Sequence, residues 1–221
     1  MTLDPRTAAD VVDACAAMIV ALGILIVATR SIGRTIWMVG LQSALVGLAA
    51  IAVGVSTGTW PVAIGGLLSI GAKGIVVPLV LGSILRRSPV RRERHPILGT
   101  RMALVAAIAI VFAATVAVDG VTLGITVAAS RALPAAVSEV LTGLLIVMTR
   151  RKALSLVVGL LVFENGIALT AFSLTYGMPF VVELGVLFDV LIVVVVAWVY
   201  ARRMLDVLGT TATDHLRTLR G

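Results

Sequence analysis

The stretch VAIGGLLSIGAKGIVVPLVLGSIL, residues 62–85, contains a single ionisable residue, Lys73, among 24 residues. About 20 consecutive apolar residues are enough for a helix to cross the hydrocarbon core of a bilayer. The stretch therefore predicts a membrane-spanning helix with one cation near its middle. A cation is costly at that depth, so its partner and its role become the first questions about this chain.

The remainder of the chain has the same apolar character. Its 221 residues are 60% hydrophobic and 13% charged, and the mean hydropathy is +1.13, far outside the range of soluble domains. We predict an all-α protein of the cell membrane, a bundle of about seven transmembrane helices in the lipid bilayer. Residues 119–131 form either an interfacial turn or an extension of a neighbouring helix. The predicted spans are 9–28, 36–56, 62–85, 102–118, 133–149, 153–176 and 180–201.

The basic residues predict the orientation, because Lys and Arg near helix ends gather on the cytoplasmic side. Fifteen of the 18 fall on one side of this map, which puts the N-terminus outside and the C-terminus in the cytoplasm. They lie against helix ends without interleaved aromatic residues, which argues against a nucleic-acid partner. The fifteen are Arg30, Arg34, Arg86, Arg87, Arg91, Arg92, Arg94, Arg101, Arg150, Arg151, Lys152, Arg202, Arg203, Arg217 and Arg220.

The cysteine and histidine counts exclude several chemistries within this chain. Cys15 is the only cysteine, and the two histidines, His95 and His215, fall in predicted loops. Disulfides, Cys-ligated iron–sulfur clusters, zinc ribbons and haem held by a histidine pair in the membrane are therefore excluded. The sequence also lacks a GxxxxGK phosphate loop. We predict no metal, no cofactor and no catalytic residue in this chain, and any redox reaction must occur on another polypeptide.

Ionisable residues at membrane depth are the candidate functional residues, because a charge there costs at least about 2.5–3.5 kcal/mol. Lys73, Glu139, Glu164 and Asp189 fall inside predicted spans, and Glu183 falls nearer the outer end of the last one. One cation cannot neutralise three acids, so some carboxylates must be protonated or pair with another subunit. All five residues are candidates for a proton path.

Lys73 stands in a weak segment of its predicted helix. Pro78 cannot donate to the carbonyl of Gly74, and Gly71 and Gly74 lower the helix propensity on either side of the lysine. We predict a small hydrated break at this point, of the kind tolerated where it faces protein or a cavity. Lys73 then either neutralises a carboxylate and holds two helices in register, or belongs to a proton path. The two roles are compatible.

Glu164 and Asp189 are 25 residues apart, up one predicted helix and down the next, so the two carboxylates can lie at similar depth. Such a pair suits proton transfer through water, although interhelical hydrogen bonding by Glu164 and Asn165 is the alternative. Glu183 is six residues from Asp189, about 240° around a helix, and is the weaker candidate.

Packing and further polar signals occur on the second predicted span. Gly40, Gly47 and Gly54 repeat every seven residues, which predicts close approach by a neighbouring helix. Gln42 and Ser43 form a polar spot on the same span.

Several motifs, in this order, carry a resemblance to a known family. They are LQS (41–43), AKGIVVPL (72–79), LTGLLIV (141–147), TRRKAL (149–154), FENG (163–166), ELGVLFDV (183–190) and LRTLRG (216–221). The chain resembles the membrane component E (HyfE) family of hydrogenase-4 and formate hydrogenlyase complexes. Residues 132–203 also resemble NuoK of respiratory complex I and MrpC of cation/proton antiporters. In the NuoK family two glutamates serve proton translocation; one matches Asp189, and the other falls on Leu161, one helical turn from Glu164.

The resemblance implies three regions: a four-helix membrane region (1–131), a NuoK-like three-helix module (132–203) and a cytoplasmic tail (204–221). It also implies a non-catalytic, cofactor-free subunit of a group 4 [NiFe]-hydrogenase-like or complex I-like assembly. The partners would be antiporter-like and other membrane-arm subunits together with hydrogenase-like or complex I-like peripheral subunits. The proton path would use Glu164 and Asp189, with Lys73 and Glu139 adjusting or extending it. The alternatives are a purely structural anchor subunit and a free-standing secondary transporter, although the sequence lacks a convincing inverted repeat.

Overall fold

The computed structural model describes residues 4–87, 97–119 and 127–175, and the regular elements within these ranges are helical. Six of the helices are long and apolar enough to cross a membrane. The third of them is one continuous span built from three segments, α3, η1 and α4, in which η1 is a π-helix. The elements are α1 (Pro5–Ala28), α2 (Ile32–Thr57), α3 (Trp60–Ser69), η1 (Ile70–Val76), α4 (Val77–Arg87), α5 (Thr100–Asp119), α6 (Val127–Thr149) and α7 (Ala153–Thr175).

The structure has an apolar helix at each of the first six predicted spans, although α1 and α2 each begin four residues earlier than predicted and α6 begins six residues earlier. We predicted that the fifth span begins at Leu133, but α6 begins at Val127 and contains Pro134 in its interior. Pro134 removes one backbone donor, but α6 continues through it. Part of the ambiguous 119–131 segment is therefore an extension of the following helix. The seventh predicted span, 180–201, lies outside the described residues, and the count of seven remains a prediction.

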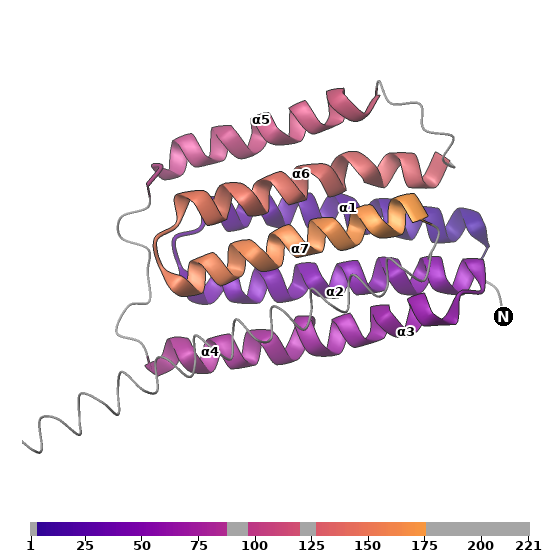
Figure 1. Ribbon diagram of the computed structural model, residues 1–221, viewed down its shortest axis with the longest axis horizontal. Helices are drawn as coiled ribbons and strands as arrows, with labels where there is room; N and C mark the ends of the chain where they lie inside the picture. The colour runs from indigo at the N-terminus through magenta and orange to yellow at the C-terminus, as the bar shows by residue number, and fades with distance from the viewer. Residues whose placement is uncertain (1–3, 88–96, 120–126, 176–221) are drawn as a thin grey trace, which may run out of the picture.

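The helices form a bundle in which α2 and α7 are the most enclosed and α5 the most exposed. Figure 1 shows α5 on the outside of the bundle, where it packs against α6 and α1. The helix α2 packs against α1 on one side and against α3, η1 and α4 on the other, and it also contacts α7. α2 is therefore the element through which the two sides of the bundle meet.

Glycines on α2 set the close approach of its neighbours, as the sequence predicted. A Cβ at Gly47 would lie 2.5 Å from the carbonyl oxygen of Gly66, and one at Gly54 would lie 2.6 Å from the nitrogen of Ala63. A Cβ at Gly40 would overlap the ring of Pro78. The three glycines thus face one continuous span, so α2 and the α3–η1–α4 helix touch backbone to backbone.

One end of the bundle collects cationic side chains. The α1–α2 and α6–α7 connections, the end of α4 and the start of α5 all lie at this end (Figure 1). Arg150 donates from Nη2 to the carbonyl oxygens of Val27 at 2.8 Å and Thr29 at 3.1 Å, and Arg30 Nε donates to Thr100 Oγ1 at 2.7 Å. We call this the basic end; its cytoplasmic location remains a prediction.

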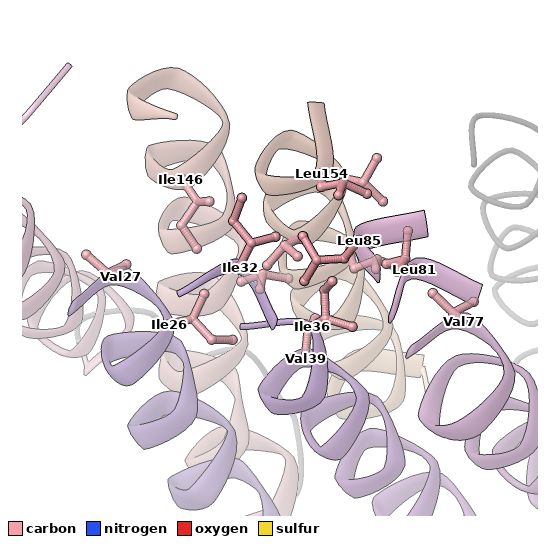
Figure 2. Packing of buried hydrophobic residues seen from close by; sticks show 14 of the residues in the cluster. Ile26, Val27, Ile32, Ile36, Val39, Val77, Leu81, Leu85, Ile146 and Leu154 are labelled. Carbon is pink, nitrogen blue, oxygen red and sulfur yellow. The ribbon is translucent and has the colours of Figure 1, made fainter. Parts of the chain in front are cut away.

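Apolar side chains pack into two clusters along the bundle. The first lies toward the basic end and joins α1, α2, α4, α5, α6 and α7; Figure 2 shows Ile26, Ile36, Leu81 and Ile146 among its members. The second lies toward the opposite end and includes Cys15, Ile19, Val46, Ala136 and Leu169. The level between the two clusters contains the polar residues described next.

Candidate functional site

Lys73 and Glu164 form a buried ion pair. The Lys73 Nζ atom lies 2.6 Å from Glu164 Oε1, and the two residues are only 6% and 3% exposed. Lys73 belongs to η1 and Glu164 to α7, so the pair joins the α3–η1–α4 span to a helix distant in sequence. The neutralising role predicted for Lys73 therefore has a defined partner.

The backbone around Lys73 is distorted but not broken. The segment Ile70–Val76 is a π-helix, and the Val77 N–H donates to the carbonyl of Ala72, five residues back. The predicted weakness near Gly74 and Pro78 is seen as this π-helical segment, through which the helix continues, and the hydration predicted there stays a prediction. The wider turn comes directly before Pro78, which cannot donate, and single π turns often occur at functional sites.

Glu139 is the second buried acid and has different partners. It is 1% exposed, and its Oε1 accepts a hydrogen bond from Gln42 Nε2. The carboxylate lies against the backbone of α1 at Gly23, where an added Cβ would be 2.7 Å from Oε2. Glycine at this position leaves room for the acid between α1 and α6.

Two buried amides and a hydroxyl connect the helices between these acids. Gln42 Nε2 also donates to the Ile19 carbonyl oxygen at 3.0 Å, and Asn165 Nδ2 donates to Gln42 Oε1 at 3.3 Å. Ser43 Oγ lies 3.1 Å from Asn165 Oδ1 and donates to it. Gln42 and Asn165 are fully buried, so these bonds satisfy groups that have no access to water.

These residues lie at one level of the bundle. Gln42 is 10 residues after the start of α2, Glu139 is 10 before the end of α6, and Glu164 is 11 after the start of α7. At 1.5 Å per residue they lie about 15–17 Å from the basic end, near the midplane of a bilayer with a core of about 30 Å. The polar layer, as we call it, consists of Gln42, Ser43, Lys73, Glu139, Glu164 and Asn165.

The structure brings together three of the five predicted site residues. Lys73, Glu139 and Glu164 belong to the polar layer, while Glu183 and Asp189 lie outside the described residues. From the sequence, Gln42 and Ser43 were predicted only as a polar spot and Asn165 as a residue that forms hydrogen bonds between helices. The connection among the three was not predicted. The signal that could have identified Gln42 and Asn165 is an amide in an apolar helix at the depth of a buried acid.

Within the described ranges, no group of three or more His, Cys, Asp or Glu side chains could hold a metal ion. The polar layer consists of ionisable and hydrogen-bonding side chains, which can bind protons and pair charges.

Comparison with known proteins gives the family. Hydrogenase-4 component E of Escherichia coli K12 is 31% identical over 150 residues, which cover 67% of this chain and 69% of that protein. The chain belongs to the hydrogenase-4 component E family. Hydrogenase-4 component E of Shigella flexneri matches to the same extent, and the uncharacterized protein Rv0085 of Mycobacterium tuberculosis is 32% identical over 95% of this chain and 96% of its own length. No family model and no solved structure matches the chain.

Membership in the hydrogenase-4 component E family agrees with the apolar helices of the structure, and we describe the chain as a multi-pass membrane protein. The likeness of residues 132–203 to NuoK and MrpC stays a prediction.

Proposed function

We propose that this chain is a membrane subunit of a hydrogenase-like or complex I-like assembly in the cell membrane, and that its polar layer carries protons laterally near the midplane. Family membership supports the assembly. The observation that carries the proton path is the Lys73–Glu164 pair at the same level as Glu139, enclosed between two apolar clusters. Buried ionisable groups at membrane depth commonly mark ion and proton pathways.

A proton can move between the two members of the Lys73–Glu164 pair without a change in the total charge of the pair. A proton that moves from Lys73 Nζ to Glu164 Oε1 converts the ion pair into an amine and a carboxylic acid, both neutral. The 2.6 Å separation allows that transfer without movement of the backbone. A charge that arrives next to the pair would favour one arrangement over the other, because an enclosed site screens charge poorly.

Apolar packing above and below the layer favours lateral movement. The clusters around Ile36 and around Ile19 fill the bundle on the two sides of the layer. A proton on Glu164 would therefore leave sideways, toward a neighbouring helix or subunit. In this proposal Asp189, on the predicted span 180–201, accepts it, and Glu183 has a lesser role. The partners are antiporter-like membrane-arm subunits and hydrogenase-like or complex I-like peripheral subunits, which perform the redox reaction.

The test is proton movement per turnover in the assembled complex, with Glu164→Gln and Asp189→Asn compared with the wild type. Co-purification from mild detergent first establishes which subunits accompany the chain. We expect either substitution to abolish coupled proton movement while the complex stays assembled. Normal proton movement in both variants would refute the proposal.

A structural anchor is the second candidate, and the hydrogen bonds within the polar layer favour it. Lys73, Gln42 and Asn165 each tie one helix to another, which is what register-fixing residues do. This role predicts loss of assembly on substitution, with normal activity of any complex that remains. A free-standing transporter, the third alternative, would purify alone or as a homo-oligomer.

A further inference from the structure

Two neutral amides separate the acids of the polar layer. On the α6 side, Glu139 accepts from Gln42, and on the α7 side, Asn165 follows Glu164 in the chain and donates to Gln42. The hydrogen-bonded connection between the α6 acid and α7 therefore runs through both amides. Each is fully buried, so water has no access to the amide groups.

The carbonyl of Ile19 fixes the direction of this connection. A backbone carbonyl only accepts hydrogen bonds, so the atom of Gln42 that lies 3.0 Å from it must be the NH₂ nitrogen. Gln42 Oε1 then points toward Asn165 and accepts from it, and Asn165 Oδ1 accepts from Ser43. The donors thus all point the same way, from Ser43 through Asn165 and Gln42 to Glu139.

A directed chain of amides transmits polarisation but resists the passage of a proton. For a proton to cross Gln42, the amide oxygen would have to gain one proton while the nitrogen gives another to Glu139. That exchange leaves an imidic acid in place of the amide. Each amide would need a second exchange to recover before the next proton could pass. A carboxylic acid at the same position needs no such rearrangement, because its two oxygens are equivalent.

We propose that Gln42 and Asn165 insulate Glu139 from the Lys73–Glu164 pair, so that the polar layer holds two separate proton-binding sites. This inference rests on the proposed function and makes it more specific, since it assigns Gln42 the part of a positioning residue between the two sites. Glu139 exchanges protons on the α1 side of α2, and Glu164 exchanges them on the η1 side. The two amides thereby prevent a proton from passing directly between Glu139 and Glu164 within one subunit.

Passive proton flux tests the inference, with the assembled complex in lipid vesicles, turnover blocked, a potassium diffusion potential applied and a pH-sensitive dye inside. We expect Gln42→Glu combined with Asn165→Asp to raise the flux several-fold, because acids then replace both insulating amides. Gln42→Leu, the apolar control, should leave the flux at the wild-type level. In the exchanged pair, Gln42→Glu with Glu139→Gln, the acid and the amide change places. One donor, one acceptor and the original number of acids remain, so its flux should be at the wild-type level.

If that combination prevents assembly, Gln42→His with Asn165→His is the second variant, because an imidazole can pass a proton between its two nitrogens, and it should raise the flux in the same way. An assembled complex of either combination with wild-type flux would overturn the inference, as would equal leakage in the exchanged pair. The proposed function fails separately, through normal proton movement per turnover in Glu164→Gln and Asp189→Asn. Loss of that movement together with wild-type flux in the combined Gln42→Glu and Asn165→Asp variant would leave the proposed function standing without the insulation.

Discussion

The two sides of α2 hold buried acids at the same depth by different means. On the η1 side Glu164 meets the ammonium of Lys73, and on the α1 side Glu139 meets the amide of Gln42 and the backbone at Gly23. Both acids are at most 3% exposed. The first has a cation that balances its charge, whereas no basic side chain is recorded within ion-pair distance of Glu139 in the described part of the chain.

The backbone differs between the two sides as well. The ion pair occurs at a π-helix, next to glycines and Pro78, whereas Glu139 lies on a helix without such a distortion at its position. A cation with a long side chain needs a geometry that delivers it to the acid, and a neutral amide needs only a hydrogen bond. The comparison teaches that a buried acid in a bundle can be held by charge or by polarity, with different consequences when the partner is lost.

The largest effect should follow removal of the cation. We expect Lys73→Leu to lower the free energy of unfolding by about 3–5 kcal/mol, because it leaves Glu164 buried without its counter-charge. Unfolding in mixed micelles or bicelles measures this. Lys152→Leu, at an exposed position of the basic end, is the matched control and should change stability by no more than about 0.5 kcal/mol.

The double variant Lys73→Leu with Glu164→Leu sharpens the same comparison. Replacement of a buried ion pair by apolar residues is often close to neutral, so the double variant should recover most of the lost stability. Equal stability of Lys73→Leu and Lys152→Leu would contradict the ion pair seen here.

The next effect concerns the glycines that face each side. Gly40→Ala should cost about 1–3 kcal/mol, because its Cβ would overlap the Pro78 ring and lie 3.0 Å from the carbonyl oxygen of Gly74, both parts of a rigid span. Gly23→Ala should cost less, since its Cβ meets the movable end of Glu139. The same unfolding measurement compares the two substitutions.

Gly65→Ala is the control for both glycines, because no described atom lies within 4 Å of the Cβ it would add. It should be neutral or stabilising by up to about 1 kcal/mol through helix propensity. A larger loss for Gly23→Ala than for Gly40→Ala would mean that the α1 side is the more rigid of the two.

Removal of the amide should have an intermediate effect. We expect Gln42→Leu to cost about 1–2 kcal/mol, because the Ile19 carbonyl, Glu139 and Asn165 each lose a hydrogen bond. This is less than the expected cost of Lys73→Leu, since no unbalanced charge results. A loss of stability as large as that of Lys73→Leu would contradict the expectation that removal of the neutral amide costs less than removal of the cation.

The smallest effect should come from Ser43→Ala. Its hydroxyl shares one proton between the Val39 carbonyl and Asn165, so the loss should be about 0.6 kcal/mol, the average for interhelical hydrogen bonds in a membrane bundle. Thermal unfolding in detergent, averaged over repeated scans, can resolve a difference of this size. Gln42→Leu is measured alongside for comparison. A larger loss of stability for Ser43→Ala than for Gln42→Leu would contradict this expected order.

Much of the fold could be predicted from the sequence. Long apolar segments separated by short polar breaks gave six spans, and the spacing of Gly40, Gly47 and Gly54 gave the face on which α2 meets its neighbour. The start of α6 was left open, because the apolar residues within 119–131 fit an interfacial turn as well as a helix extension, and α6 in fact begins at Val127. The sequence predicted a weak point in the helix at Lys73. It did not predict that the helix would continue through this point as a π-helical segment.

The candidate site was predicted only as separate residues. Lys73, Glu139 and Glu164 were identified because ionisable groups are costly at membrane depth. Their partners were not, since the sequence paired Glu164 with Asp189 by depth and left Lys73 without a specific acid. Whether Asp189 also approaches Glu164 is a separate prediction, which the Asp189→Asn experiment addresses.

The sequence by itself determined that this chain is a helical membrane protein, how most spans are bounded, and that its cations gather at one end. Those features follow from composition along the chain, because lipid requires long apolar helices and charges remain at their ends. Only the tertiary structure decided that Lys73 meets Glu164 and that Gln42 lies between Glu139 and Asn165. Lipid is as apolar as a protein interior, so hydrophobicity does not distinguish the face of a helix that meets lipid from the face that meets another helix. That choice is made by packing and by the few hydrogen bonds and charges that must be satisfied inside the bundle.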